Sequence, residues 1–204
     1  MDFHTFETMT TIEKYIKKPI LPSKFADLVG LQYTATVTKE HKKGKGQFFT
    51  PSEISSFMGN IASKPKSKNI SILDPGCGTA ILTCSLIEKL IAYTEQSLQN
   101  LKIWLAEKRV EFRYTIIAND FIEDMAIALE KHKESFDYII SNPPYFKLSK
   151  DDKRVNLFQH LVKGQPNIYS FFMAVSVNLL KANGELIFIV PRSFASGQYF
   201  NSFR

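Results

Sequence analysis

The stretch Phe136-Asp137-Tyr138-Ile139-Ile140-Ser141-Asn142-Pro143-Pro144-Tyr145-Phe146 decides the fold of this chain. Its first part is a short apolar run, which is typical of a buried strand. The Asn-Pro-Pro sequence ends that strand, because proline donates no ladder hydrogen bond and restricts the residue before it. Asn142 is therefore predicted to lie at the carboxyl end of a strand, which is the edge of an open α/β sheet where ligands bind.

The residues after this strand suit a planar amino group as substrate. The Asn142 amide and the carbonyls fixed by Pro143 and Pro144 can accept hydrogen bonds, and the Tyr145 ring can stack on a flat partner. None of these groups is a nucleophile or a strong base, which favours transfer of a group onto a weakly nucleophilic nitrogen. The structural alternative is a proline-rich turn that only closes the strand.

Composition and charge limit the class of protein. The 204 residues suffice for one domain with a substantial core, and 44% apolar and 23% charged residues are ordinary for a globular protein. A net charge of +6 favours a polyanionic partner. No signal peptide or apolar run of about 20 residues occurs, so a cytoplasmic location without a membrane partner is predicted. Cys77 and Cys84 are too few for a disulfide framework or a zinc site, and no metal is expected.

A second predicted strand, residues 69–73, leads into Asp74-Pro75-Gly76-Cys77-Gly78-Thr79-Ala80 and a helix over residues 81–90. Strand, glycine-rich turn and helix form the nucleotide-binding opening of a doubly wound fold, in which Gly76 and Gly78 would let the backbone approach a ligand closely. The carboxylate of Asp74 at the strand end favours a cationic ligand over a pyrophosphate. A bare tight turn is the alternative.

A third strand is predicted over residues 114–118 and ends in Asn119-Asp120-Phe121. Asp120 either caps a helix over residues 122–132 or adds a polar strand end beside those of Asp74 and Asn142.

The last part of the chain supplies the fourth predicted strand. Residues 147–165 are predicted to form a mobile surface loop. A helix is predicted to begin at Asn167 and end at Asn183-Gly184, with an apolar face made of Ile168, Phe171, Phe172, Val175 and Leu179. The strand follows over residues 185–190. Taken together, the elements predict an α/β fold with a doubly wound, mostly parallel sheet.

A second candidate ligand-binding segment precedes the first strand. Thr50 as N-cap, Pro51 at the first helical position and Glu53 form a capping box, which is a sufficient structural explanation of these residues. The box leaves residues 47–49 unexplained. The functional alternative is a lid, whose free backbone amides and threonine hydroxyl face a bound small molecule.

The residues before this segment form a small helical and basic N-terminal part, predicted to span residues 1–45. Helices are predicted over residues 10–18 and 23–32. Residues 39–46 form a basic loop that is either solvated or in contact with phosphates.

Four sequence blocks now stand in order: GQFFTP (46–51), DPGCGTA (74–80), NDF (119–121) and NPPY (142–145). Together they resemble the gamma-class N6-adenine DNA methyltransferases of restriction-modification systems, especially the Eco57I-like type II group. NIYSFF (167–172) and GELIFIVPRSF (184–194) are similar to the next blocks of that family. The resemblance implies a Rossmann-like methyltransferase domain over residues 46–204, S-adenosylmethionine as cofactor and double-stranded DNA as partner.

The resemblance also implies roles for individual residues. Cofactor contacts fall on Asp74, Gly76 and Gly78 beneath the cofactor, Thr50 and Pro51 over its methionine end, Asp120 and Phe121 at its adenine, and Glu95 at its ribose. The catalytic group is Asn142, Pro143, Pro144 and Tyr145. A flipped adenine would donate its amino hydrogens to the Asn142 side-chain oxygen and the Pro143 carbonyl, while Tyr145 stacks on its ring.

The chain departs from the family at three places, the first of which is Ala80, where the family often has another glycine. The stretch after residue 90 is short for a second strand, which is either abbreviated to residues 91–94 or lost, and Glu95 is equally well explained as a solvated residue at a helix start. The family's last two strands and its target-recognition domain do not follow, so a truncated catalytic part is expected. Its expected protein partner is a restriction or specificity subunit or a C-terminal recognition domain.

Two alternatives to DNA adenine methylation stay open. The NPPY block is shared with enzymes that methylate RNA bases or protein glutamine, so another planar nitrogen is one alternative substrate. An inactive remnant that binds only the cofactor or DNA is the other.

Overall fold

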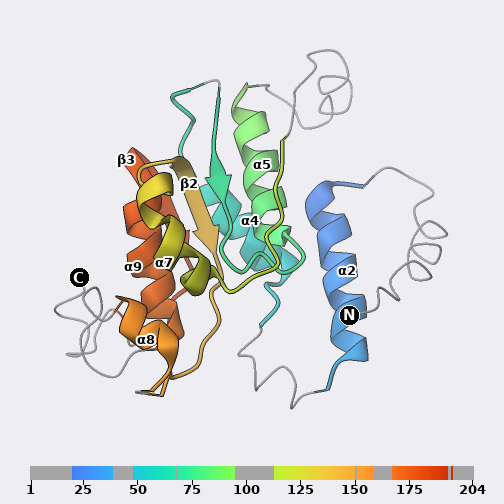
Figure 1. Ribbon diagram of the computed structural model, residues 1–204. Helices are drawn as coiled ribbons and strands as arrows, with labels where there is room; N and C mark the ends of the chain where they lie inside the picture. The colour runs from blue at the N-terminus through green and yellow to red at the C-terminus, as the bar shows by residue number, and fades with distance from the viewer. Residues whose placement is uncertain are drawn as a thin grey trace.

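The computed structural model describes residues 20–38, 48–67, 69–94, 113–149, 151–158, 167–192 and 194. Its sheet has the strand order β1-β2-β3, with parallel pairing of β1 (Ile72–Leu73) to β2 (Phe136–Ser141) and of β2 to β3 (Leu180–Phe188). One face carries α2 (Pro22–Thr36), α4 (Ser52–Ile61) and α5 (Ile81–Thr94), and the other carries α7 (Phe121–His132), α8 (Lys153–Phe158) and α9 (Ile168–Leu179) (Figure 1). The predicted doubly wound α/β arrangement is confirmed.

Strand β2 divides the hydrophobic core into two layers. Tyr138 and Ile140 join the cluster formed with α2, α4 and α5, whereas Ile139 joins the cluster formed with α7 and α9. Successive side chains of a strand point to opposite faces, so a strand covered on both sides must be apolar at nearly every position. This is why the run before Asn142 is a strong sequence signal.

The predicted helices on either side of β2 are confirmed. Asp120 caps α7 by accepting hydrogen bonds from the backbone N–H groups of Ile122 (2.9 Å) and Glu123 (3.1 Å). Asn167 caps α9, whose predicted apolar face is buried at every position: Ile168, Phe171, Phe172, Val175 and Leu179. None of the described helices has the length and apolarity needed to cross a membrane.

The boundary between the last helix and the last strand differs from the prediction. Helix α9 ends at Leu179 and β3 starts at Leu180, so Asn183-Gly184 lies inside the strand. Asn183 has a φ of +64°, and a Cβ on Gly184 would come within 3.0 Å of the Asp137 carbonyl oxygen. The pairing of β2 with β3 shifts register here. The Asn-Gly sequence therefore marks an irregularity inside a strand, where glycine is common, and does not end the helix.

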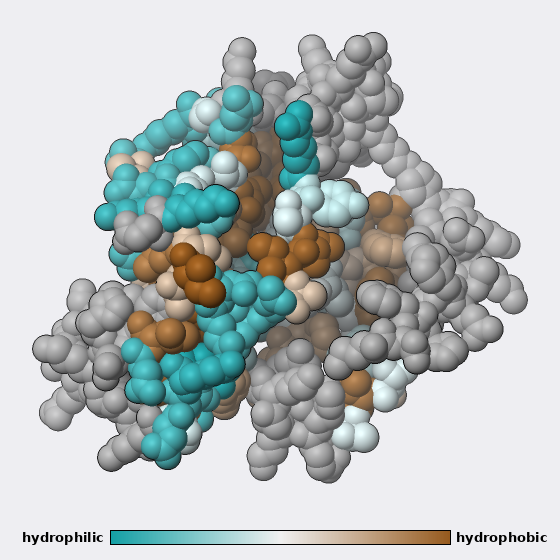
Figure 2. All heavy atoms as spheres, in the orientation of Figure 1, coloured by the Kyte–Doolittle hydropathy of each residue, from teal (hydrophilic) through white to brown (hydrophobic). Residues whose placement is uncertain are grey.

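The third predicted strand does not form. Residues 113–118 have no regular structure, and Ile116 and Ile117 are 77% and 63% exposed. On the face of the molecule that Figure 2 shows, hydrophobic side chains lie among hydrophilic ones. Among the described strands β1 pairs only with β2, so its other edge is open and residues 113–118 do not add a strand to it.

Two further expectations are corrected. Residues 91–94 continue α5 and do not form an abbreviated strand, and Tyr93 among them packs against the core cluster of that helix. The described part of 147–165 contains α8 and a β-bridge between Lys147 and Asn167, where a surface loop was predicted. The predictions for residues 10–18, 39–46 and Glu95 lie outside the described residues, whereas the helix predicted over 23–32 is confirmed within α2.

Candidate functional site

The carboxyl ends of the three strands form one connected edge. The Ser141 hydroxyl at the end of β2 is buried and donates a 2.6 Å hydrogen bond to the Pro75 carbonyl, in the turn after β1. The backbone N–H of Ile189, after β3, donates to the Ser141 carbonyl at 3.1 Å. The polar groups that follow β1 and β2 are thus held side by side, as the sequence predicted for Asp74 and Asn142.

The side-chain amide of Asn142 is held from two directions. Its Nδ2 donates to the Phe48 carbonyl and to the Thr50 hydroxyl oxygen, both at 3.1 Å. Its Oδ1 accepts a 2.8 Å hydrogen bond from the Tyr145 hydroxyl. Since the amide nitrogen has only two hydrogens, both are in use, and Oδ1 keeps one lone pair for a further donor.

The Tyr145 hydroxyl lies between two acceptors. It is 2.8 Å from Asn142 Oδ1 and 2.8 Å from the Ile189 carbonyl, and its one hydrogen serves both. Burial, with a smaller contribution from Tyr169, raises the pKa of Tyr145 to about 12. The phenol is therefore a neutral donor at physiological pH. Its hydroxyl links the segments that follow β2 and β3.

The predicted capping box is wrong. The N-cap of α4 is Pro51, whose carbonyl accepts from the backbone N–H of Ser55 at 2.9 Å, and no side chain caps the helix. Thr50 is only 7% exposed and directs its hydroxyl to Asn142 instead. A contact across the fold replaces the local hydrogen bond that the sequence pattern suggested.

The two aromatic residues before Thr50, which no sequence rule explained, have different positions. Phe49 packs its ring against Tyr33 with 5.5 Å between centroids, and lies 3.7 Å from where a Cβ on Gly78 would be. Phe49 therefore anchors the segment to α2 and to the glycine-rich turn. Phe48 is 65% exposed, and its ring centroid lies 6.2 Å from that of Tyr145. The sequence feature that could have indicated both positions is the pair of adjacent aromatic residues that the capping box leaves unexplained.

The glycine-rich turn after β1 has the backbone that its sequence predicts. Gly76 and Gly78 have φ values of +73° and +54°, in the left-handed region that glycine enters without strain. Asp74 accepts a 2.8 Å hydrogen bond from the Thr83 hydroxyl through Oδ2, whereas its Oδ1 is buried and has no partner among the described residues. Desolvation raises the pKa of Asp74 to about 7, against the opposing effect of the Thr83 hydrogen bonds.

An unpartnered buried carboxylate oxygen is costly unless a donor or a cation reaches it. The Asp74 carboxyl group therefore suits a ligand with an ammonium group, and the predicted contact with a cationic ligand stays a prediction. An ammonium beside it would restore the ionised form, because a nearby positive charge lowers a carboxyl pKa.

Asp120 has partners on both oxygens. Oδ1 accepts the two cap hydrogen bonds, and Oδ2 accepts from Arg154 Nη1 at 3.1 Å. Arg154 also binds Asp152 through Nη2 at 2.6 Å and lies 5.5 Å from the centre of the Phe146 ring. Of its two predicted roles, Asp120 has that of a helix cap. Arg154, which lies in the stretch predicted to be a surface loop, joins Asp120 to the segment after β2.

One aromatic ring, that of Phe172, lies between Phe121 and the glycine-rich turn. The ring centroid of Phe121 is 5.0 Å from that of Phe172, and Phe172 lies 3.6 Å from where a Cβ on Gly76 would be. Phe172 therefore lies between Phe121 and Gly76, and contact of Phe121 with a cofactor stays a prediction. Glu95, the candidate acid for a ribose, lies outside the described residues.

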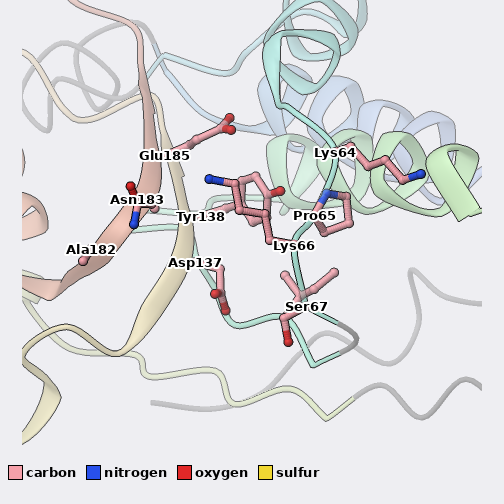
Figure 3. Close-up of a pocket in the computed structure, with 11 residues that line it drawn as sticks. Lys64, Pro65, Lys66, Ser67, Asp137, Tyr138, Ala182, Asn183 and Glu185 are labelled. Carbon is pink, nitrogen blue, oxygen red and sulfur yellow. The ribbon is translucent and has the colours of Figure 1, made fainter.

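A hollow of about 160 Å³ lies beside the amino-terminal end of β2, away from the strand ends described above (Figure 3). Asp137, at the start of β2, lines it and pairs with Lys181 at 2.8 Å, and Tyr138 donates to the Ser63 carbonyl. None of the predicted site residues lines this hollow, because those residues follow the strands and Asp137 begins one. It is separate from the candidate site.

Cys77, in the glycine-rich turn, and Cys84, in α5, are free thiols, and neither is activated as a nucleophile. Burial raises the pKa of Cys77, and raises that of Cys84 to about 11. A thiol is a nucleophile only as the thiolate, so neither side chain has the character of a catalytic cysteine.

Comparison with known proteins gives a family match over residues 76–204, to the model described as Eco57I restriction-modification methylase. The chain is 37% identical over 186 residues to the type II methyltransferase M.BsuBI of Bacillus subtilis, and 30% identical over 207 residues to M.PstI of Providencia stuartii. These alignments cover 81% and 91% of the chain. The chain spans only 37% and 41% of the length of these two relatives.

Among solved structures, the fold is similar to that of a Listeria monocytogenes protein described as a class I S-adenosylmethionine-dependent methyltransferase. The TM-score is 0.59 with 18% sequence identity, over 98% of this chain and 65% of that one. At this identity the likeness concerns the fold alone, and it agrees with the parallel α/β sheet described above.

Proposed function

The chain belongs to the Eco57I restriction-modification methylase family, and from that premise we propose that it carries the cofactor-binding and catalytic residues of a DNA adenine-N6 methyltransferase of a restriction-modification system. One observation carries the proposal most directly. The Asn142 amide, at the end of the central strand, is held by Phe48, Thr50 and Tyr145 and retains a lone pair for a substrate hydrogen.

S-adenosylmethionine is the proposed cofactor. The unpartnered Oδ1 of Asp74 suits its ammonium group, and the backbone at Gly76 and Gly78 suits close approach of a ligand. Proposed further contacts are Thr50 and Pro51 at the methionine end, Asp120 and Phe121 at the adenine, and Glu95 at the ribose. When bound, the cofactor supplies an electrophilic methyl group.

The proposed chemistry needs no general base. The lone pair of an adenine amino group is delocalised into the ring, so the nitrogen is a poor nucleophile. Hydrogen bonds to Asn142 Oδ1 and to the carbonyl of Pro143 would draw its hydrogens out of the ring plane and localise the lone pair. Transfer of the methyl group would leave the cofactor as a neutral thioether and the nitrogen positively charged, and the nitrogen would then lose its proton to water. The Tyr145 ring is the proposed stacking face for the flipped base, with a contribution of about 1–3 kcal/mol.

Residues 46–204 are proposed to belong to the methyltransferase domain, with residues 1–45 as a small N-terminal segment. Within that segment, the Ser23 backbone N–H and hydroxyl each donate to the Glu88 carboxylate at 2.8 Å, which ties α2 to α5. The net charge of +6 supports double-stranded DNA as partner. A restriction or specificity subunit, or a C-terminal recognition domain, is the proposed source of sequence recognition.

Titration calorimetry with S-adenosylmethionine tests the first part of this proposal. Saturable binding is expected, and no binding by a chain that circular dichroism shows to be folded would overturn it. The second part is tested with methyl-labelled cofactor and separate DNA, RNA and protein substrates, followed by mass spectrometry of the products. N6-methyladenine in DNA is expected. Label in RNA or in glutamine would support the alternative substrates, and binding without any transfer would support a remnant.

A further inference from the structure

We propose that Thr50 is a positioning residue for methyl transfer, which acts by fixing the side-chain amide of Asn142. The inference rests on the proposed function and deepens it. It gives Thr50 a role in the catalytic group that is separate from contact with the cofactor. The contact that carries it is the 3.1 Å hydrogen bond from Asn142 Nδ2 to the Thr50 hydroxyl oxygen.

The partners of Nδ2 decide which way the amide faces. The Phe48 carbonyl accepts one hydrogen and the Thr50 hydroxyl accepts the other, each at 3.1 Å. A carbonyl can only accept, so a flipped amide would place Oδ1 against the Phe48 oxygen with no hydrogen between them. Together the two acceptors leave Oδ1 on the side away from residues 48–50. This is the atom that must meet the substrate amino group.

The surroundings make the Thr50 contact hard to replace. Thr50 is 7% exposed, so water has little access to the position of its hydroxyl. The packing of Phe49 against Tyr33 and near Gly78 holds the segment in place. A hydrogen bond in such a site is stronger than one in water, and its loss leaves the Nδ2 hydrogen without a partner.

Loss of the hydroxyl should therefore loosen the amide without removing it. Asn142 would keep Phe48 and Tyr145 as partners, but its amide plane would be fixed at one Nδ2 hydrogen instead of two. Small displacements of a reacting group lower the rate steeply. We expect the catalytic constant to fall about five- to tenfold, the factor that corresponds to one hydrogen bond. The Michaelis constant for S-adenosylmethionine should stay within about twofold of wild type.

The first experiment measures the amide itself and needs no turnover. In the full chain labelled with ¹⁵N-asparagine, the Asn142 side-chain signal is assigned by its loss in Asn142→Ala. Its hydrogens should exchange with water more slowly than those of Asn60, which is exposed. Thr50→Val, which keeps the shape but removes the hydroxyl, should speed the exchange several-fold and shift the signal. Thr50→Ser, which keeps the hydroxyl, should restore the wild-type behaviour.

A matched control is available on α2. Thr36→Val makes the same substitution at an exposed residue, whose hydroxyl donates to the Tyr33 carbonyl of the same helix at 2.9 Å. It should change neither the Asn142 signal nor the rate. An Asn142 signal in wild type that exchanges as fast as that of Asn60, or that ignores Thr50→Val, would overturn the inference alone.

The second experiment separates positioning from cofactor contact. Methyl transfer by Thr50→Val should show the loss in the catalytic constant, with rescue by Thr50→Ser and unchanged affinity in calorimetry. A loss confined to cofactor affinity, with an unchanged Asn142 signal, would make Thr50 a cofactor contact and overturn the inference. A wild-type chain that neither binds S-adenosylmethionine nor transfers a methyl group would overturn the proposed function itself.

Discussion

Asn142 Nδ2 lies 3.1 Å from the Thr50 hydroxyl oxygen, although 92 positions separate the two residues in the sequence. The hydrogen bond joins two of the four sequence blocks directly. A third block is joined through the buried hydrogen bond from Ser141, the neighbour of Asn142, to Pro75. These three blocks therefore form one connected group at the strand ends, and we expect a change in one of them to affect the other two.

Asn142→Ala should abolish methyl transfer and spare cofactor binding. The substitution removes the acceptor proposed for the substrate amino group and leaves Asp74 and the glycine-rich turn intact. We expect the rate to fall at least about 100-fold, as when a preorganised hydrogen-bonding group is removed from an active site. Labelled methyl transfer and calorimetry measure the two effects. Asn60→Ala, at an exposed position of α4, is the control. Equal loss of transfer and of cofactor affinity would count against the assigned role.

Tyr145→Phe should lower stability by about 1 kcal/mol, because it leaves two acceptors, Asn142 Oδ1 and the Ile189 carbonyl, without their shared donor. The stacking face is kept, so we expect a modest fall in the rate of transfer. Urea unfolding measures the stability, and Tyr114→Phe, at a residue that is 86% exposed, should leave it unchanged.

The raised pKa of Tyr145 gives this prediction a pH limit. Its value of about 12, above the ordinary 10, means that the hydroxyl contributes fully below pH 10. That contribution is lost as the pH rises through 12. The difference between wild type and Tyr145→Phe should thus be constant between pH 6 and 9. A difference that varies across this range would show that another group controls the contact.

The sequence predicted well those elements that depend on neighbouring residues. The β2 strand, the buried face of α9 and the cap of α7 at Asp120 follow from apolar spacing and from one side chain each, and all three are confirmed. The order of the blocks along parallel strands then implied that Asp74 and Asn142 share an edge. These inferences needed no knowledge of distant contacts.

The failures occurred where a distant contact competes with a local rule. Thr50 and Glu53 fit a capping box, but the Thr50 hydroxyl bonds to Asn142 instead. The strand expected before Asp120 had a suitable apolar pattern, but a strand also needs a partner, which the pattern of a single segment does not report. Asn183-Gly184 fits both a helix end and a strand irregularity, and only the pairing with β2 decides between them.

Asp74 should make cofactor binding depend on pH. An ammonium ligand needs the carboxylate, whereas the free chain holds Asp74 protonated below its pKa of about 7. Affinity should therefore rise about tenfold per pH unit up to pH 7, and up to one proton should be released per cofactor bound below it. Calorimetry in two buffers that differ in ionisation enthalpy counts the protons. Asp74→Asn should bind weakly, with the pH dependence lost.

The same pKa shift has a consequence for the free chain. Because the folded-state pKa of Asp74 lies above the ordinary 3.8, its protonated form contributes stability fully below pH 3.8. That contribution is lost as the pH rises through about 7. Asp151→Asn, at an exposed carboxylate, is the control and should change neither affinity nor stability. Cofactor affinity that is flat from pH 5 to 7 in wild type would remove Asp74 from the site.

Arg154 should prove to be the residue that ties α8 to the start of α7. Its guanidinium binds Asp120 at 3.1 Å and Asp152 at 2.6 Å, and its side chain is 19% exposed, so neither ion pair is fully screened by solvent. Arg154→Met should lower the free energy of unfolding by about 1 kcal/mol in urea. Arg154→Lys should recover only part of this loss of stability, because a point charge cannot hold two carboxylates as the planar guanidinium does.

The neighbouring Lys153 supplies the control, since its side chain is 73% exposed and pairs with Glu123 at 2.7 Å. Lys153→Met should change stability little, and an equal loss in both variants would mean that charge near α7, rather than the geometry of Arg154, stabilises α8.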